Sequence, residues 1–467
     1  MPVTDVQRLH DKWPLRFARG AALFSNGYSN GVIGAVITLL TREHPGGQFG
    51  TQFHSKLLAS MVYPGTVFGM LLCGWLLSTV GMSIVVLPVV VILCSVLTAL
   101  VAIWNGGRVG GLVAGVSFLR CVLGMGVGAG QSSGCVFPSE WTEQDGVVKN
   151  VRHRWLVLGT KTMIDAGFVL AAFVPLVLYW RFGEQHLRTI YSLSLGLGAI
   201  PASVLVCEFI VWCWWITPKY DNYSLPKAVH IPIWLTLKWY WKSVLGLSLA
   251  WFIYDFIMYP FGIYSSMIIN NITGGNSSLS IVLGWSVVIN LFCIPGTVFG
   301  IFLIDCLGVK TTMIIGLLLQ AIVGFAMAIM YSQLTNHIAT FALVYGIFLS
   351  LGEVGPGSCL RILAAKTGPV VRVGGQIYNI AAMIGQVGAF IGTWVLPHII
   401  DAFGGSQTMK GNSGPFWIGG GLAILNAVVT FSLVKPLTHD NMKAEDKAFC
   451  QYLEVHGVDA SHIHDGI

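Results

Sequence analysis

Long apolar runs separated by short polar segments dominate the hydrophobicity pattern of this chain. A helix needs about 20 apolar residues to cross the roughly 30 Å of hydrocarbon in a bilayer, and a sliding reading of hydropathy finds about a dozen such runs. The predicted membrane helices cover residues 19–41, 54–78, 82–104, 110–137, 155–179, 188–216, 244–268, 279–304, 310–332, 338–362, 375–399 and 415–435. The pattern therefore predicts an all-α membrane protein with twelve transmembrane helices.

Composition supports the bilayer as the principal partner. Of the 467 residues, 55% are apolar and 10% are charged, whereas about a quarter of the residues in soluble domains are charged. The ten cysteines fall almost entirely inside apolar runs, without a CxxC pair or a Cys/His cluster, so we expect no metal, cofactor or disulfide framework. The sequence also shows no phosphate loop and no nucleophile motif, which argues against an enzyme.

The distribution of Lys and Arg indicates the orientation, because cytoplasmic loops near helix ends are enriched in these residues. With an even number of helices and both termini in the cytoplasm, roughly two-thirds of the basic residues fall on the cytoplasmic side. We interpret the net charge of +6 as a topology signal and expect no nucleic-acid partner. The same orientation places the glycosylation sequons at Asn271 and Asn276 on the external face.

One hexapeptide, PGTVFG, occurs twice, at residues 64–69 in the second predicted helix and at residues 295–300 in the eighth. Its matching positions indicate two related six-helix halves, a plan common among secondary transporters that rock about a central site. The two glycines of GTVFG are four residues apart and permit close helix packing. The predicted organisation is a cytoplasmic head (1–18), a first bundle (19–216), a cytoplasmic linker (217–243), a second bundle (244–435) and a cytoplasmic tail (436–467).

Two charged residues in predicted helices are candidates for binding an anionic solute. Asp255 lies about halfway along the seventh predicted helix, where an ionisable group costs at least ~2.5 kcal/mol. Trp251, Asp255 and Tyr259 are four residues apart and share one helix face. Asp255 is therefore either part of a functional site or a structural aspartate that pairs with a neighbouring helix. Arg120 either binds two phosphate oxygens through its guanidinium or serves as an ion-pair partner between helices.

Other charges within the predicted helices have more local explanations. Lys161 and Asp165 are four residues apart and can neutralise each other on one helix face. We expect Arg361, near the inner end of the tenth helix, to extend toward the membrane interface. Glu353 lies deeper, just before the sequence GPG, and both a functional and a structural role are open for it.

The segments that follow the two hexapeptides resemble the loop signature of the major facilitator superfamily. The second copy, GIFLIDCLGVKT, keeps the acidic residue of that signature at Asp305, whereas the first, GMLLCGWLLSTVGMS, has Ser78 at this position. The resemblance implies two pseudo-symmetric six-helix bundles. It also implies gating or structural roles for Asp305 and for Glu140 and Lys366, which end the fourth and tenth helices.

A narrower resemblance covers nearly the whole chain. The segments RHRWLVLGTKTMIDAGFV, SLAWFIYDFIMYPFGIYSSMII and YGIFLSLGEVGPGSCLRILAAKTG resemble the phosphate:proton symporter group, and most closely its fungal glycerophosphodiester permeases. This resemblance implies proton-driven uptake of a small phosphorylated organic solute at the plasma membrane by a protein that functions as a monomer. It implies a substrate site of Trp251, Asp255, Tyr259, Arg120, Asn26, Gln131 and Ser358, with Asp255 also carrying the coupling proton.

Several of these positions depart from the family pattern. Asn26 replaces an aspartate, Gln131 lies where an acidic-Tyr-Pro segment is usual, Ser358 replaces an asparagine, and Gln386 replaces a lysine. Fewer titratable groups remain, so Asp255 would carry the coupling proton largely alone. Two alternatives stay open: a facilitator or exporter of a different organic solute on the same scaffold, and, less favoured, a nutrient sensor that binds its solute without moving it.

Overall fold

The computed structural model describes residues 13–44, 52–79, 96–98, 100, 109–142, 149–204, 233–273, 278–367, 371–435 and 448–456. Within these ranges the chain is almost entirely helical, and it contains ten helical segments that are long and apolar enough to cross a membrane. The helix predicted at 82–104 lies almost entirely outside the described residues, and the one predicted at 188–216 is described only as far as residue 204. The other ten predicted helices are each matched by a helical segment.

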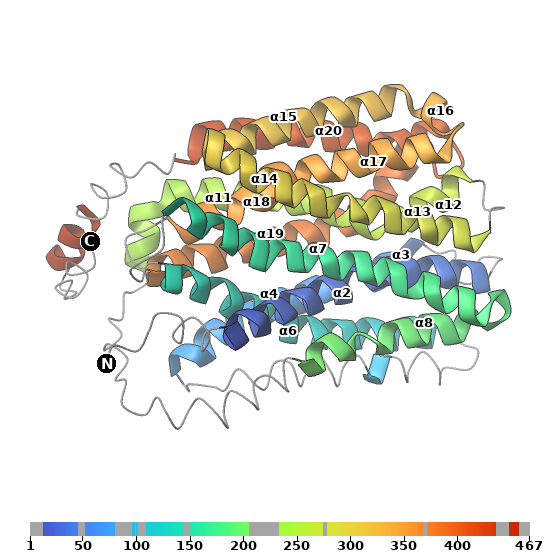
Figure 1. The fold of residues 1–467 in the computed structure, drawn as a ribbon, viewed down its shortest axis with the longest axis horizontal. Helices are drawn as coiled ribbons and strands as arrows, with labels where there is room; N and C mark the ends of the chain where they lie inside the picture. Colours follow the sequence, from blue (N-terminus) through green and yellow to red (C-terminus); the bar gives the residue numbers. More distant parts are fainter. Residues whose placement is uncertain are drawn as a thin grey trace, which may run out of the picture.

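The first half of the chain forms helices that pair in a defined order. These helices are α2 (Trp13–Glu43), α3 (Gln52–Ser60), α4 (Val62–Thr79), α6 (Val109–Thr142), α7 (Lys149–Phe182), η1 (Glu184–His186) and α8 (Leu187–Gly196). The most extensive packing joins α2 to α7 and α4 to α6. In Figure 1 these blue to green helices run alongside one another in the lower part of the molecule.

The second half repeats this pairing. Its helices are α11 (Ile233–Ile263), α12 (Ser265–Ile272), α13 (Leu279–Leu291), α14 (Cys293–Leu307), α15 (Val309–Ile329), α16 (Tyr331–Leu334), α17 (Ile338–Gly352), η2 (Glu353–Gly357), α18 (Ser358–Ala365), α19 (Val371–Ala402) and α20 (Met409–Leu433). The first membrane helix of this half, α11, packs along the fifth, α19, and α14 packs on α17 and η2 of the fourth. The second half therefore reproduces the order found in the first, as an internal duplication predicts.

The repeated hexapeptide brings two helices together in each half. A methyl group on Gly65 of α4 would collide with the backbone carbonyl of Cys121 on α6, and one on Gly296 of α14 would collide with Ser350 on α17. Since only glycine lets two backbones approach this closely, the prediction of close helix packing at both copies is confirmed.

Two membrane segments of the second half are interrupted. The eighth predicted span is divided at Phe292 into α13 and α14, and the tenth is divided into α17, the π-helical turn η2 and α18. Pro356 lies inside η2, where its missing N–H and rigid ring disturb regular helical hydrogen bonding. Short π-helical turns of this kind occur often at functional sites, and Glu353 is the first residue of this one.

Helix α11 begins earlier than predicted, at Ile233, so residues 233–243 of the expected linker are helical. Hydropathy marks only the apolar core of a span, whereas this extension mixes Trp, Tyr and Lys, which suit the membrane interface. The helical residues 448–455 of the predicted tail pack on this extension. The ring of Phe449 lies 5.2 Å from that of Tyr240, between ring centroids.

The two halves are joined at the end of the bundle where α2 terminates, which we call the Glu43 end. The contacts there are Thr38 Oγ1 with Ser266 Oγ (2.8 Å), Arg42 Nη2 to Asn270 Oδ1 (2.8 Å), Lys56 Nζ with His398 Nε2 (2.9 Å) and Trp180 Nε1 to Ser280 Oγ (2.8 Å). In Figure 1 this end lies on the right, beside α12. Asn271, a predicted glycosylation site, lies in α12 at the same end, and Asn276 lies outside the described residues.

Candidate functional site

A cavity between the two halves is the candidate site for a solute. It comprises about 670 Å³ of space that protein atoms do not fill, open solvent included. Helices α6 and α7 line it from the first half, and α11, α13, α14, α17, η2, α18 and α19 line it from the second. A solute bound here would therefore touch both halves.

Five charged side chains line this cavity: Lys161, Asp165, Asp255, Glu353 and Arg361. Two are cations and three are carboxylates, so the wall carries a formal charge of −1 when all five are ionised. Charged side chains inside a membrane protein are costly, and they generally mark a solute or ion pathway. The cavity wall is therefore suited to a charged solute rather than to an apolar one.

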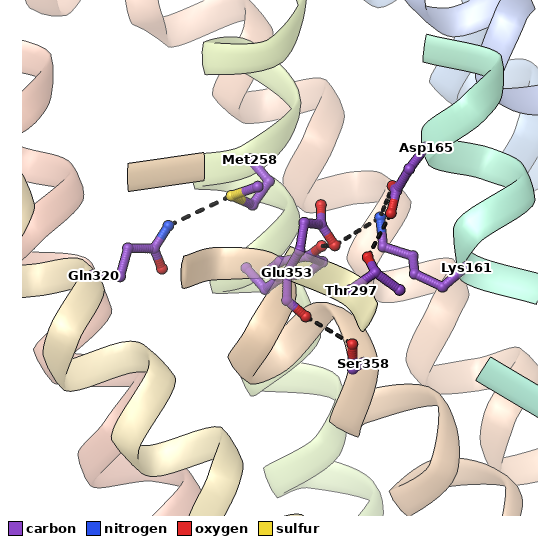
Figure 2. A network of polar contacts seen from close by, with 8 residues as sticks. Lys161, Asp165, Met258, Thr297, Gln320, Glu353 and Ser358 are labelled. Carbon is purple, nitrogen blue, oxygen red and sulfur yellow. Dashed lines mark hydrogen bonds and ion pairs between the residues drawn. The ribbon is translucent and has the colours of Figure 1, made fainter. Parts of the chain in front are cut away.

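Lys161 is the centre of a polar network that joins the halves (Figure 2). Its Nζ lies 2.7 Å from Asp165 Oδ1 on the same helix and 2.8 Å from Glu353 Oε2 on η2. Thr297 of α14 donates a hydrogen bond to Asp165, and Tyr254 of α11 donates one of 3.0 Å to Glu353. The predicted pair of Lys161 and Asp165 is confirmed. The second carboxylate that contacts Lys161, that of Glu353 from the other half, was not predicted; the sequence GPG after Glu353 signalled a break in the helix but not this pairing.

Asp255 lies in the cavity wall with Trp251 and Tyr259 one turn to either side. The three share one face of α11, as their spacing predicted. The Asp255 side chain is buried, and its Oδ2 atom has no hydrogen-bond partner among the described residues. The ion pair with a neighbouring helix that the sequence left open is not found within the described part of the chain. The solute and proton roles of Asp255 stay predictions.

Aromatic packing fixes the wall around Asp255. The Tyr259 ring meets Tyr63 edge to face, with 5.3 Å between ring centroids, and lies 6.2 Å from Phe168. Trp251 meets Tyr378 in the same way at 5.2 Å. Edge-to-face pairs of this kind stabilise a defined ring orientation, so the aromatic side chains present fixed surfaces to the cavity.

Arg120 and Asn26 do not line this cavity. The Nη1 atom of Arg120 donates to the Ser29 carbonyl at 3.1 Å, and its Nε and Nη2 atoms are buried without a partner among the described residues. Asn26 Oδ1 accepts a hydrogen bond of 2.7 Å from Asn30. The structure thus places these two predicted residues inside the first half, behind the cavity wall.

Of the two remaining predicted solute contacts, one lies in the cavity wall and the other is buried next to a wall residue. Gln131 lines the cavity together with Gln386. Ser358 is fully buried and is not a lining residue; its hydroxyl donates to the Glu353 carbonyl at 2.8 Å. This bond supplies a partner for a backbone acceptor in the irregular turn η2, so Ser358 supports the position of Glu353.

The prediction that Arg361 extends to the membrane interface was wrong. Arg361 lines the cavity, and its Nη1 atom donates to the Tyr378 hydroxyl at 3.3 Å. A side chain reaches the interface only from a lipid-facing position, whereas Arg361 lies on the face of α18 that packs toward α19. Hydropathy locates a residue along the membrane normal but does not show which way it faces.

Two of the predicted gating residues, Asp305 and Lys366, do not line the cavity. Asp305 is near the end of α14, and Lys366 follows α18, each half-buried. Glu140 belongs to α6, but its side chain lies outside the described part of the structure. Their gating roles stay predictions.

Comparison with known proteins agrees with this architecture. The family model described as "Sugar (and other) transporter" matches residues 18–220 and 227–446. The chain is similar to the glycerophosphocholine permease GIT4 of Candida albicans, with 38% identity over 96% of this chain and 83% of that protein. It is also similar to the glycerophosphodiester transporter GIT2 of the same organism, with 36% identity over 98% of this chain and 84% of that protein.

Solved structures show the same fold. A crystal structure of the D-xylose-proton symporter superposes with a TM-score of 0.71 at 17% identity, covering 91% of this chain and 98% of that one. The two six-helix bundles, the paired helices and the cavity between them therefore form a major facilitator fold. The chain belongs to the sugar (and other) transporter family of the major facilitator superfamily, in the branch that contains the fungal glycerophosphodiester permeases.

Proposed function

We propose that this protein takes up a glycerophosphodiester by proton-coupled alternating access. The observation that carries the proposal is the cavity between the halves, whose wall combines two cations with three carboxylates. A phosphodiester is a compact anion that an ammonium and a guanidinium can bind. The named substrates of the relatives GIT4 and GIT2 are of this class, which supports transport rather than an enzymatic role.

The contacts at the Glu43 end support a cavity that is closed on that side. Placing both termini in the cytoplasm makes this the external side of a plasma-membrane protein, in agreement with the distribution of Lys and Arg. Transport then requires these contacts to break while others form at the opposite end. One chain contains both halves of the cavity, so a monomer suffices.

Charge balance favours coupling to protons. The empty wall carries a formal charge of −1, and a phosphodiester adds another negative charge. Burying unbalanced charge in a membrane protein is costly. For a solute whose only charge is its phosphodiester, such as glycerophosphoinositol, protonation of two carboxylates leaves the loaded cavity neutral, and we assign one of these protons to Asp255, whose Oδ2 has no partner among the described residues.

The remaining predicted residues act in this proposal by direct contact with the solute, by electrostatic potential or by supporting other groups. Trp251, Tyr259 and Gln131 lie in the wall and contact the solute directly. Arg120, which is near Tyr63 and outside the wall, contributes positive potential. Asn26 and Ser358, which are buried outside the wall, hold neighbouring groups in place.

The test is a substrate panel in cells that lack their own phosphate and glycerophosphodiester permeases. Uptake of labelled glycerophosphocholine, glycerophosphoinositol and inorganic phosphate is measured at two external pH values. We expect uptake of at least one glycerophosphodiester, and faster uptake at the lower pH. Uptake of none of the three would reject the proposal in favour of a different cargo. Uptake that does not depend on pH would support a permease whose transport is not coupled to protons.

A further inference from the structure

The ion pair between Lys161 and Glu353 crosses from one half of the molecule to the other. We propose that the phosphate group of the solute displaces Glu353 from Lys161, and that the released Glu353 carboxylate then binds a proton that moves with the solute. Lys161 and Glu353 would thus be specificity-determining residues, and the exchange between them would couple solute binding to proton binding. The proposal rests on the proposed function and adds a mechanism for its coupling.

The two carboxylates on Lys161 are held differently. Asp165 lies four residues from Lys161 on α7, and its second oxygen accepts a hydrogen bond from Thr297. This pair stays together however the halves move, because one helix carries both residues. Glu353 belongs to the other half and has one further side-chain hydrogen bond, from Tyr254. Glu353 is therefore the partner that an incoming anion can replace.

The backbone of the turn η2 lies directly against the Glu353 carboxylate. Glu353 opens the π-helical turn η2, which contains Pro356. A methyl group on Gly357 would collide with the Glu353 carboxylate and would lie 2.7 Å from the Tyr254 hydroxyl. Only glycine at this position leaves room for the carboxylate where it lies, and short π-helical turns such as the one that carries Glu353 occur often at functional sites.

Other charged and titratable groups decide what happens to Glu353 after release. Around it lie Lys161 and Asp165 from α7, Tyr254 and Asp255 from α11, Cys293 from α14, and Arg361 from α18. With Lys161 bound to the solute phosphate, Glu353 would remain as a buried carboxylate near two others. An unpaired buried charge of this kind is strongly unfavourable, so it takes up a proton from solvent. No covalent bond forms or breaks in the solute.

Binding affinity measured against pH tests this exchange. The full-length protein is purified in lipid nanodiscs, and the Kd for glycerophosphocholine is measured at about pH 5.5 and about pH 7.5. In the wild type, binding requires a protonated Glu353, so the Kd should rise with pH. Glu353→Gln removes the competing charge, so it should bind about tenfold more tightly at the higher pH. The two proteins should converge at the lower pH.

Two further variants complete the test. Lys161→Gln should bind weakly at both pH values, whereas Lys410→Gln, which removes an exposed lysine at the start of α20, should match the wild type. Tyr254→Phe removes the hydrogen bond that stabilises the ionised form of Glu353. It should extend tight binding to higher pH, and it provides the decisive measurement if Glu353→Gln does not fold.

The outcomes separate the two proposals. If wild type binds glycerophosphocholine but Glu353→Gln and Tyr254→Phe keep its pH dependence, the exchange is overturned and the proposed function stands. Binding by Lys161→Gln at wild-type affinity also overturns it. A folded wild-type protein that binds neither glycerophosphocholine nor glycerophosphoinositol refutes the proposed function, and the exchange with it.

Discussion

At the scale of single residues, the cavity wall concentrates charges that a membrane protein keeps at considerable cost. Buried ion pairs contribute little net stability, because desolvation offsets much of their attraction. The network around Lys161 is therefore poorly explained as a stabilising device, since apolar side chains would fill the same volume at lower cost. A solute that brings its own negative charge gives such a network a function.

Asp255→Asn tests the coupling role of the carboxylate without an obvious partner. An amide cannot carry a coupling proton, so accumulation driven by a pH gradient should fall at least about tenfold. Exchange of labelled for unlabelled solute, which needs no net proton movement, should persist. Glu184→Gln, which changes an exposed residue of η1, is the matched control. Accumulation by Asp255→Asn at the wild-type rate would contradict the coupling role and would indicate that this side chain has a structural role.

The sequence predicted local relations between residues better than relations across the molecule. The pair of Lys161 and Asp165 follows from helical spacing and is present at 2.7 Å. Glu353 comes from a distant helix, and one sequence without an alignment contains no signal for that pairing. Arg361 was misplaced because its depth is readable from hydropathy, whereas its orientation depends on how α18 packs.

At the scale of helices, the two hexapeptides fix pairs of neighbours that cannot separate without losing close backbone contact. Gly65→Ala should destabilise the folded protein by about 1–3 kcal/mol, since the added methyl group meets the Cys121 carbonyl. Gly284→Ala is the control, because a methyl group there meets no atom within 4 Å. Thermal unfolding of the purified variants measures both effects. Equal Tm values for the two variants would contradict the close packing.

The tail helix offers a second prediction at this scale. Phe449 is fully buried against α11, where it packs on Trp239 and Tyr240. Phe449→Ala should release the tail helix, because losing a buried phenyl ring costs about 3–5 kcal/mol. Faster protease cleavage near residue 448 would report the release. Val455→Ala, at a side chain that is 83% exposed, should leave cleavage unchanged, and equal cleavage of all three proteins would argue against docking.

Helix boundaries were predictable where an apolar core ends abruptly and were not where interfacial residues extend it. Helix α11 shows this, since its first turns contain Trp and Lys side chains that a hydropathy average excludes. The break in the tenth span was signalled by GPG, yet the π-helical geometry that presents Glu353 depends on packing against α14 and α15.

At the scale of the whole molecule, long apolar runs and one repeated hexapeptide predicted two helical halves, and the resemblance to the major facilitator superfamily implied the paired-bundle fold. The state of closure was not predictable in this way, because it depends on side-chain contacts between distant segments. Thr38 and Ser266, for example, meet at the Glu43 end from different halves. Such contacts are the ones that alternating access must break.

Cross-linking at the Glu43 end tests this movement. The hydroxyl oxygens of Thr38 and Ser266 are 2.8 Å apart, so cysteines at both positions should form a disulfide on oxidation. The bridged protein should lose transport, and a reducing agent should restore it, because the cavity can no longer open on that side. Each variant that contains only one of the two introduced cysteines serves as a control. Full transport by the oxidised double variant would show that this end need not open.

The most direct test of the central claim is accumulation of labelled glycerophosphocholine and glycerophosphoinositol by the purified protein in liposomes with an imposed pH gradient. The account predicts that at least one of them is concentrated on the alkaline side. It also predicts that an uncoupler abolishes this accumulation. Liposomes with correctly folded protein that neither accumulate nor exchange either compound would contradict the account.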